Sequence, residues 1–286
     1  MGKIICLTSG GVDSIILTWG LAYIFPEHIC QPLYLQSKLS GAYWKREQKA
    51  NMMAYNRFHD KFPNVLEPTF YGGADVKVSR GRTKYRNQIY IDTVVRLYGD
   101  DPDVIGMSMG VTPGWSAEGV HAWSLAEQDH DPSFLEEYLK KQKPDWNFFS
   151  YHVFTPYDWN LSEKSGRLLM GIPILGTDWI WERQACQLWF TGEHRYSYLG
   201  EGILATGGCG RCHSCVGTFA AITYALGYDK TPYRTNPLQS RWFPQFAVQY
   251  KSLDLFLKAL PFNRDGVVRR ELKKWRAREN QRLTSA

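Results

Sequence analysis

The sequence lacks any long apolar segment. No apolar run approaches the roughly 20 residues that a membrane-spanning helix requires. The first residues, Met1–Leu7, form too short an apolar stretch for a signal peptide and carry no small-residue cleavage site. We therefore expect a soluble, cytoplasmic protein that has no membrane partner.

Internal repeats and low-complexity tracts are also absent. The 286 residues are 44% hydrophobic and 22% charged, which is ordinary for a globular protein. Much of the net charge of +6 lies within 267–282, where Val268, Leu272 and Trp275 recur at i, i+4 and i+7. This spacing predicts a helix with one apolar stripe and a solvated basic back, so we do not expect contact with nucleic acid.

Short apolar runs alternate with helical patterns over the first part of the chain. We predict strands at 3–8, 32–36, 65–71, 103–107 and 153–154. We predict helices after the first strand and at 43–60, 86–98, 132–142, 162–170 and 216–227, with two more within 251–282. The stretch 231–247, which holds three prolines, is expected to be an irregular connection. This alternation indicates an α/β fold in which a parallel sheet carries helices on both faces.

Three regions follow from this pattern. We expect an α/β domain over 1–180, a cysteine-bearing region over 181–230 packed on it, and a helical extension over 231–286.

A glycine loop separates the first strand from the first helix, and its residues are Ser9, Gly10, Gly11, Val12, Asp13 and Ser14. Two glycines let the backbone turn tightly, and the start of a helix presents N–H groups and positive potential. The hydroxyls of Ser9 and Ser14 can donate to phosphate oxygens. The loop lacks the lysine of a Walker loop and is not G-x-G-x-x-G, which argues against a Walker-type NTPase and a Rossmann dehydrogenase.

Cysteine is scarce, and half of the six cysteines form one cluster. Cys209, Cys212 and Cys215 are spaced C-x2-C-x2-C, and Cys186 precedes the first of them by 23 positions. Four thiolates complete a tetrahedral structural zinc site, so we expect Zn2+ on these residues. An iron–sulfur cluster is the alternative occupant. The other two cysteines, Cys6 and Cys30, are interpreted as core residues.

The string Ser-Gly-Gly-Val-Asp-Ser resembles the SGGxDS signature of the PP-loop ATP pyrophosphatase superfamily, also described as adenine nucleotide alpha hydrolase-like. The resemblance implies that ATP is cleaved between its α- and β-phosphates. It also implies that Ser9, Gly10, Gly11, Asp13 and Ser14 hold the pyrophosphate portion, while AMP is transferred to the substrate.

The loop and the cysteine pattern together resemble the 7-cyano-7-deazaguanine synthase family over roughly residues 3–220. Arg86-Asn87 is similar to that family's Gly-Arg-Asn segment, although Tyr85 stands where the family has glycine. Thr155-Pro156 and Glu163-Lys164 are similar to its Thr-Pro and Asn-Lys-Ala-Glu segment. The gap after Cys186 and the tail after Cys215 are longer than is usual in the family.

The resemblance implies a ligase that uses ATP, Mg2+ and Zn2+. Such an enzyme adenylates 7-carboxy-7-deazaguanine, admits ammonia to form the amide, and uses a second ATP to reach the nitrile. Lys164 and Arg86 are the candidate catalytic cations, and Asn87 is a candidate nucleotide ligand. The residues that we consider for the base are Trp115, Glu118, Trp123 and Asp129.

Other functions remain open at this point. Relatives in phage DNA-modification and antiphage systems suggest a protein amine as the acceptor in place of ammonia. A PP-loop tRNA-modifying enzyme is a second alternative, and its sulfur-transfer branch would need Cys6 or Cys30 as the catalytic thiol. A non-catalytic module that has kept the fold is a third alternative. The expected partners are a deazapurine carboxylate and ammonia, with a protein substrate and a homodimer as further options.

Overall fold

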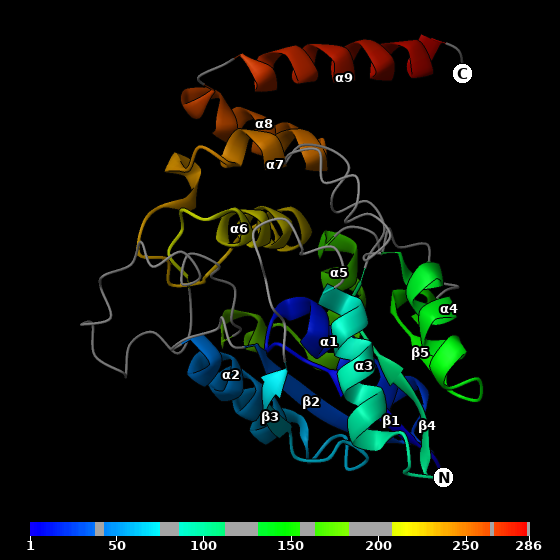
Figure 1. The fold of residues 1–286 in the computed structure, drawn as a ribbon. Helices are drawn as coiled ribbons and strands as arrows, with labels where there is room; N and C mark the ends of the chain where they lie inside the picture. Colours follow the sequence, from blue (N-terminus) through cyan, green and yellow to red (C-terminus); the bar gives the residue numbers. More distant parts are fainter. Residues whose placement is uncertain are drawn as a thin grey trace. The chain divides into compact units, whose positions relative to one another are not determined.

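A computed structural model of the chain describes residues 1–37, 43–74, 86–111, 131–154, 164–182, 208–263 and 266–284. The chain divides into two compact units, Met1–Gln184 and Ala185–Ala286. Figure 1 shows the course of the chain through their helices and strands. Within the described ranges, no helix is both long enough and apolar enough to cross a bilayer.

The first unit contains a sheet of five strands that all run parallel. The strands are β1 (Lys3–Leu7), β2 (Ile29–Ser37), β3 (Thr69–Ala74), β4 (Val104–Ser108) and β5 (Asn147–Phe149). Their order across the sheet is β3-β2-β1-β4-β5. The order reverses between β1 and β4, and in doubly wound sheets ligands bind at such a reversal, outside the carboxyl ends of the strands.

Helices and short 3-10 segments connect these strands or follow the last of them. In chain order they are α1 (Val12–Ile24), α2 (Tyr43–Phe58), α3 (Arg86–Tyr98), α4 (Pro132–Gln142), η3 (Tyr151–Phe154), α5 (Lys164–Leu175) and η4 (Asp178–Glu182). The predicted bounds of α3 and α4 are confirmed. The strand predicted at 153–154 is wrong: these residues belong to η3, and the fifth strand lies a few residues earlier.

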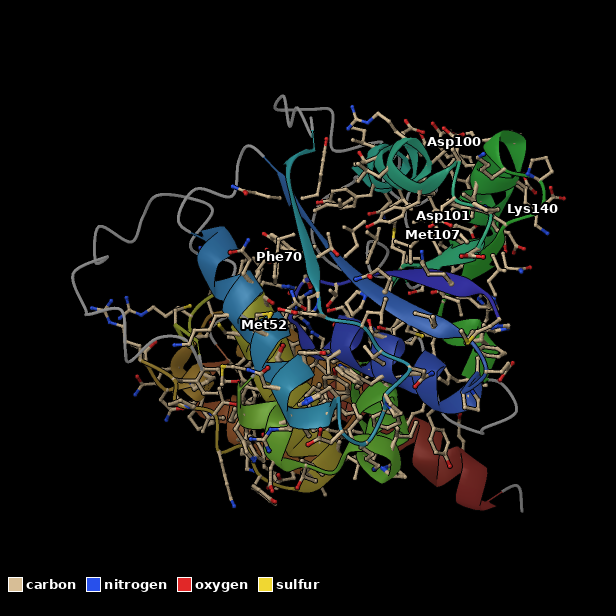
Figure 2. All side chains as sticks on the ribbon, turned by 90° about the horizontal axis from the view of Figure 1, so that it is seen from below. Met52, Phe70, Asp100, Asp101, Met107 and Lys140 are labelled. Atoms are coloured by element: carbon tan, nitrogen blue, oxygen red, sulfur yellow. The ribbon has the colours of Figure 1, made fainter. Side chains whose placement is uncertain are left out.

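The two faces of the sheet carry different helices. Ile5, Leu33 and Met107 belong to a buried cluster that includes α3 and α4 side chains such as Ile91 and Leu135. Met107 can be followed in Figure 2, between the sheet and these helices. Side chains alternate along a strand, so neighbouring residues of β1 and β2 point to the opposite face.

The opposite face is covered by α1, α2 and α5. Tyr34 of β2 donates a hydrogen bond to Glu47 of α2. Helix α1 is buried along most of its length. It packs closely on α5 at Gly171, where an added Cβ would lie only 2.7 Å from Cγ1 of Ile16. The predicted α/β fold with helices on both faces is therefore present in the first unit.

The second unit is helical within its described residues. Its elements are α6 (His213–Leu226), η6 (Pro237–Gln239), α7 (Phe243–Tyr250), α8 (Leu253–Ala259), η7 (Leu260–Phe262) and α9 (Val267–Thr284). Val268 and Leu272 of α9 are buried, as the predicted apolar stripe requires, whereas the side chain of Trp275 lies outside the description. Helix α7 was not predicted and begins within the stretch 231–247, which we expected to be irregular. Its Pro244 lies in the first turn, where a missing N–H is tolerated.

Candidate functional site

The glycine loop lies at the carboxyl end of β1, beside the reversal in strand order. Gly10 has a φ of +70°, a conformation that favours glycine. A Cβ at Gly10 would lie 2.6 Å from Cβ of Ala50 and 3.0 Å from the carbonyl oxygen of Glu47, both on α2. The positive φ and the close approach of α2 therefore both require glycine at this position.

Hydrogen bonds of small polar side chains hold the loop in shape. The Ser14 hydroxyl accepts a hydrogen bond from the Ser9 amide at 3.1 Å and donates to the Gly11 carbonyl at 3.1 Å. Thr8 Oγ1 donates to Oδ1 of Asn51 on α2 at 2.6 Å. The Ser14 hydroxyl, which the sequence analysis offered as a phosphate donor, thus forms hydrogen bonds within the loop itself.

Asp13, in the first turn of α1, forms ion pairs with two cations of α5. Its Oδ2 atom lies 2.9 Å from Nζ of Lys164, and its Oδ1 atom lies 2.6 Å from Nη1 of Arg167. Burial raises the pKa of the Asp13 carboxyl, but the charges and hydrogen bonds of the two cations outweigh burial and keep the pKa below its ordinary value of 3.8. The carboxylate is therefore ionised at neutral pH.

Tyr151 of η3 completes this group. Its hydroxyl donates to the main-chain carbonyl of Asp13 at 2.6 Å, and its ring lies 4.7 Å from the guanidinium carbon of Arg167. Burial, followed by the charge of Asp13, raises the pKa of the Tyr151 hydroxyl. The phenol accordingly stays protonated and keeps its role as a hydrogen-bond donor.

Asp13 and Lys164 were predicted as site residues from the sequence, whereas Arg167 and Tyr151 were not. A charged residue inside a helix is normally exposed, so nothing local in the sequence marks Arg167 as buried. One feature of the sequence could have indicated that Arg167 belongs to the site. Lys164 and Arg167 are spaced i and i+3, which places both on one face of α5.

The remaining predicted loop partners can be placed only in part. Arg86 and Asn87 open α3, and Asn87 is buried. Because each connecting helix of a parallel sheet runs back from the carboxyl edge, these residues begin at the same edge of the sheet as the glycine loop. The side chain of Arg86 lies outside the description. Other predicted residues also lie outside the described ranges: Thr155, Pro156 and Glu163, and the base-binding candidates Trp115, Glu118, Trp123 and Asp129.

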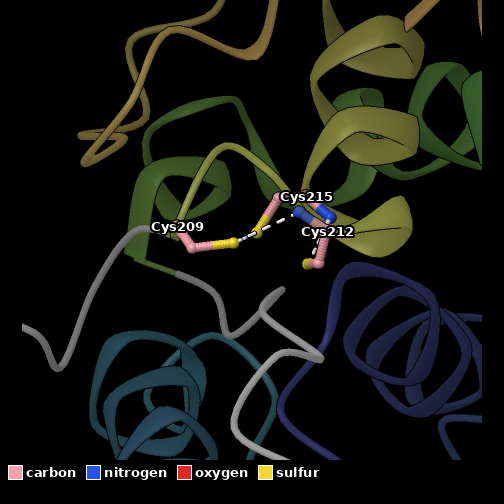
Figure 3. A group of neighbouring side chains, drawn as sticks. All are labelled: Cys209, Cys212 and Cys215. Atoms are coloured by element: carbon pink, nitrogen blue, oxygen red, sulfur yellow. Dashed lines mark hydrogen bonds between the residues drawn. The ribbon is translucent and has the colours of Figure 1, made fainter. Parts of the chain in front are cut away.

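The second unit brings Cys209, Cys212 and Cys215 together, as Figure 3 shows. All three are buried, and their sulfur atoms lie within 4.8 Å of one another. Sγ of Cys209 is 3.8 Å from Sγ of Cys215. This matches the edge of about 3.8 Å that tetrahedral zinc–sulfur bonds of about 2.3 Å imply. The three thiols could therefore hold a metal ion such as zinc.

Backbone amides surround two of these sulfurs. The amides of Arg211 and Cys212 each donate to Sγ of Cys209 at 3.3 Å, and the amide of Cys215 donates to Sγ of Cys212 at 3.4 Å. Cys212 is also the N-cap of α6. Amide donors and a helix N-terminus stabilise thiolates, which are the form that binds metal.

A neighbouring segment supports the cysteine loop. Thr235 Oγ1 donates to the Cys209 carbonyl at 2.6 Å, and Ser240 Oγ donates to the Arg211 carbonyl at 3.0 Å. Gly210 has a φ of +71°, and a Cβ there would lie 1.8 Å from the Thr235 carbonyl oxygen. These protein contacts therefore hold the cysteine loop in its conformation. The predicted fourth ligand, Cys186, lies outside the described residues.

Cys6 and Cys30 lie within the sheet of the first unit, as the sequence analysis expected. Both are fully buried. A hydrogen bond with Cys6, together with burial, raises the pKa of the Cys30 thiol. A buried thiol of this kind is a poor nucleophile.

Comparisons with known proteins identify no relative of this chain: no family model, no curated protein and no solved structure matches it.

Proposed function

We propose that the chain is an ATP-dependent ligase that adenylates the carboxylate of 7-carboxy-7-deazaguanine, or of a close analogue, and releases AMP and pyrophosphate. The observation that carries the proposal is the 2.9 Å contact between Lys164 and Asp13. It joins two of the segments that carry the resemblance, the glycine loop and the segment of Lys164, although they lie far apart in the sequence. The reversal of strand order beside the loop supports the same assignment.

The loop is suited to the pyrophosphate end of ATP. The first amides of a helix have no acceptor within the helix, so those at the start of α1 can donate to phosphate oxygens. Asp13, Lys164 and Arg167 together carry a net charge of +1, which favours an anion. Mg2+ would enter with the nucleotide and neutralise phosphate charge. Its ligands would include phosphate oxygens of the nucleotide.

The proposed reaction makes an unreactive carboxylate susceptible to amination. A carboxylate oxygen attacks the α-phosphorus of ATP, and pyrophosphate leaves with the electrons of the broken P–O bond. Lys164, with Arg86 as a second candidate cation, stabilises the charge that develops on the phosphates. Ammonia then attacks the acyl carbon and AMP leaves, which yields the amide. Adenylation of the amide oxygen by a second ATP, followed by loss of AMP and protons, yields the nitrile.

We further propose that Cys209, Cys212, Cys215 and Cys186 bind a structural Zn2+. The 3.8 Å separation of two sulfurs and the burial of all three described thiols support this assignment. A site with four protein ligands leaves no position open for substrate, so the ion would stabilise the second unit without entering the chemistry.

Product analysis tests the function directly. The protein is incubated with ATP, Mg2+, 7-carboxy-7-deazaguanine and ammonium, and the products are identified by mass spectrometry. We expect AMP, pyrophosphate and the amide or nitrile. Formation of ADP would contradict the ATP chemistry. AMP without amide or nitrile would contradict the small-molecule product, and a mass increase on an added protein would then favour a protein amine as acceptor.

Two substitutions sharpen this test. Lys164→Ala should abolish AMP formation, whereas Lys140→Ala should leave it unchanged, because Lys140 forms an exposed ion pair with Glu136 on α4. The sulfur-transfer alternative is tested by Cys6→Ser and Cys30→Ser. Their burial leads us to expect turnover in both variants, and loss of turnover in properly folded variants would favour sulfur transfer.

A further inference from the structure

The two cations that contact Asp13 occupy separate oxygens of its carboxylate. Arg167 takes Oδ1 and Lys164 takes Oδ2. Each contact can therefore break without displacing the other. A carboxylate held in this way can keep one partner while it loses the second.

The surroundings of the two cations are unequal. The side chain of Arg167 is 3% exposed, whereas that of Lys164 is 16% exposed. Arg167 also lies against the ring of Tyr151, whose hydroxyl is bonded to the Asp13 main chain. The planar guanidinium is thus enclosed between two groups that themselves contact each other. Lys164 is the first residue of α5, and its ammonium sits on a flexible four-carbon stem.

We propose that Arg167 is a positioning residue that retains Asp13 while Lys164 exchanges Asp13 for the phosphates of ATP. This inference rests on the proposed ATP site. Arg167 does not touch the nucleotide and acts through Asp13. Arg167 keeps the Asp13 carboxylate neutralised after Lys164 has left. Departure of the lysine therefore does not leave a partly buried negative charge without a cation beside it.

The charges define what Arg167 contributes. With both cations present, the group of Asp13, Lys164 and Arg167 carries a net charge of +1. Without Arg167, Asp13 and Lys164 neutralise each other, and transfer of Lys164 to ATP would leave Asp13 unpaired. Loss of Arg167 should therefore weaken ATP binding, and removal of the Asp13 charge should restore it.

A double-mutant cycle tests this proposal. Binding of a non-hydrolysable ATP analogue with Mg2+ is measured by calorimetry for the wild-type protein, Arg167→Met, Asp13→Asn and the double variant. We expect Arg167→Met to weaken binding about tenfold, which is within the range of coupling between contacting residues. Asp13→Asn combined with Arg167→Met should bind more tightly than Arg167→Met alone. A purely structural role for Arg167 would not give such a rescue.

Arg96→Met is the matched control. Arg96 lies on α3, and its guanidinium carbon is 6.0 Å from the ring centre of Tyr71. It repeats the arginine–tyrosine contact on an exposed surface without an Asp13 partner. Its binding should equal that of the wild-type protein. Thermal unfolding of each variant establishes that it is folded before its affinity is compared.

A second comparison covers the case in which Arg167→Met does not fold. The double variant carries the same net charge in this group as the wild-type protein and has no Asp13 carboxylate to retain, so these two proteins should bind the analogue with similar affinity. Clearly weaker binding by the double variant than by the wild-type protein, wild-type affinity in Arg167→Met, or absence of rescue overturns the inference and leaves the ATP site intact. Absence of binding by the wild-type protein overturns both.

Discussion

Nη1 of Arg167 lies 2.6 Å from Oδ1 of Asp13, although the two residues are 154 positions apart in the sequence. This contact joins the helix that follows the glycine loop to the helix that carries Lys164. It makes Asp13 part of the packing of the first unit as well as of its candidate site. The stability of the unit and the charge of the site are therefore linked through one carboxylate.

This link predicts a pH dependence. The pKa of Asp13 is lowered in the folded state, so its ionised form stabilises the protein above the ordinary value of 3.8, and that stability is lost as the pH falls below it. Asp13→Asn should be less stable than the wild-type protein at neutral pH, and the difference should shrink in acid. Chemical denaturation at several pH values measures this, and a difference independent of pH would contradict it.

Gly10→Ala should destabilise the protein through the loop. A positive φ costs a non-glycine residue about 1–2 kcal/mol, and the overlap with Ala50 and Glu47 adds about 1–3 kcal/mol. Gly176→Ala is the matched control, because Gly176 has a φ of +77° but no atom within 4 Å of its added Cβ. Denaturant titration should show a larger loss for Gly10→Ala. Equal losses would show that α2 does not constrain the loop.

Cys212→Ser should remove the proposed metal ion. The remaining thiols cannot complete a tetrahedral site, and structural zinc contributes directly to folding free energy. Metal analysis should find zinc in the wild-type protein and little in the variant, which should also unfold at a lower temperature. Cys30→Ser is the control, because Cys30 is a buried thiol of the sheet and is not one of the proposed ligands. The Cys30→Ser protein should therefore retain zinc. Iron in the wild-type protein would instead favour a cluster.

Leu272→Ala should destabilise the second unit. Leu272 is a buried residue of α9, and truncation of such a side chain costs about 2–5 kcal/mol. Val267→Ala, in the same helix, should change the free energy of unfolding by less than about 0.5 kcal/mol, because Val267 is exposed. Urea titration compares the two. Similar effects would mean that the apolar stripe of α9 does not anchor the helix.

Strong local patterns made some elements predictable. Helix α4 begins at Pro132, and the side chain of Asp131 caps it by accepting the Ser133 amide. Such a start signal is readable from sequence. The fifth strand was misplaced because three residues give too short a pattern to locate. Helix α7 was not predicted because the three prolines of the stretch 231–247 suggest a loop, although Pro244 lies where a helix tolerates it.

The amino-acid sequence alone indicated the glycine turn between a strand and a helix, and the cysteine spacing. Both are short-range features, in which neighbouring residues dictate the backbone. The tertiary structure decided which groups meet at the turn. It brought Asn51 onto Thr8, and Arg167 and Tyr151 onto Asp13. Those contacts depend on how α2, η3 and α5 are placed around the glycine loop and α1. A buried arginine is tolerable only where a carboxylate lies opposite it.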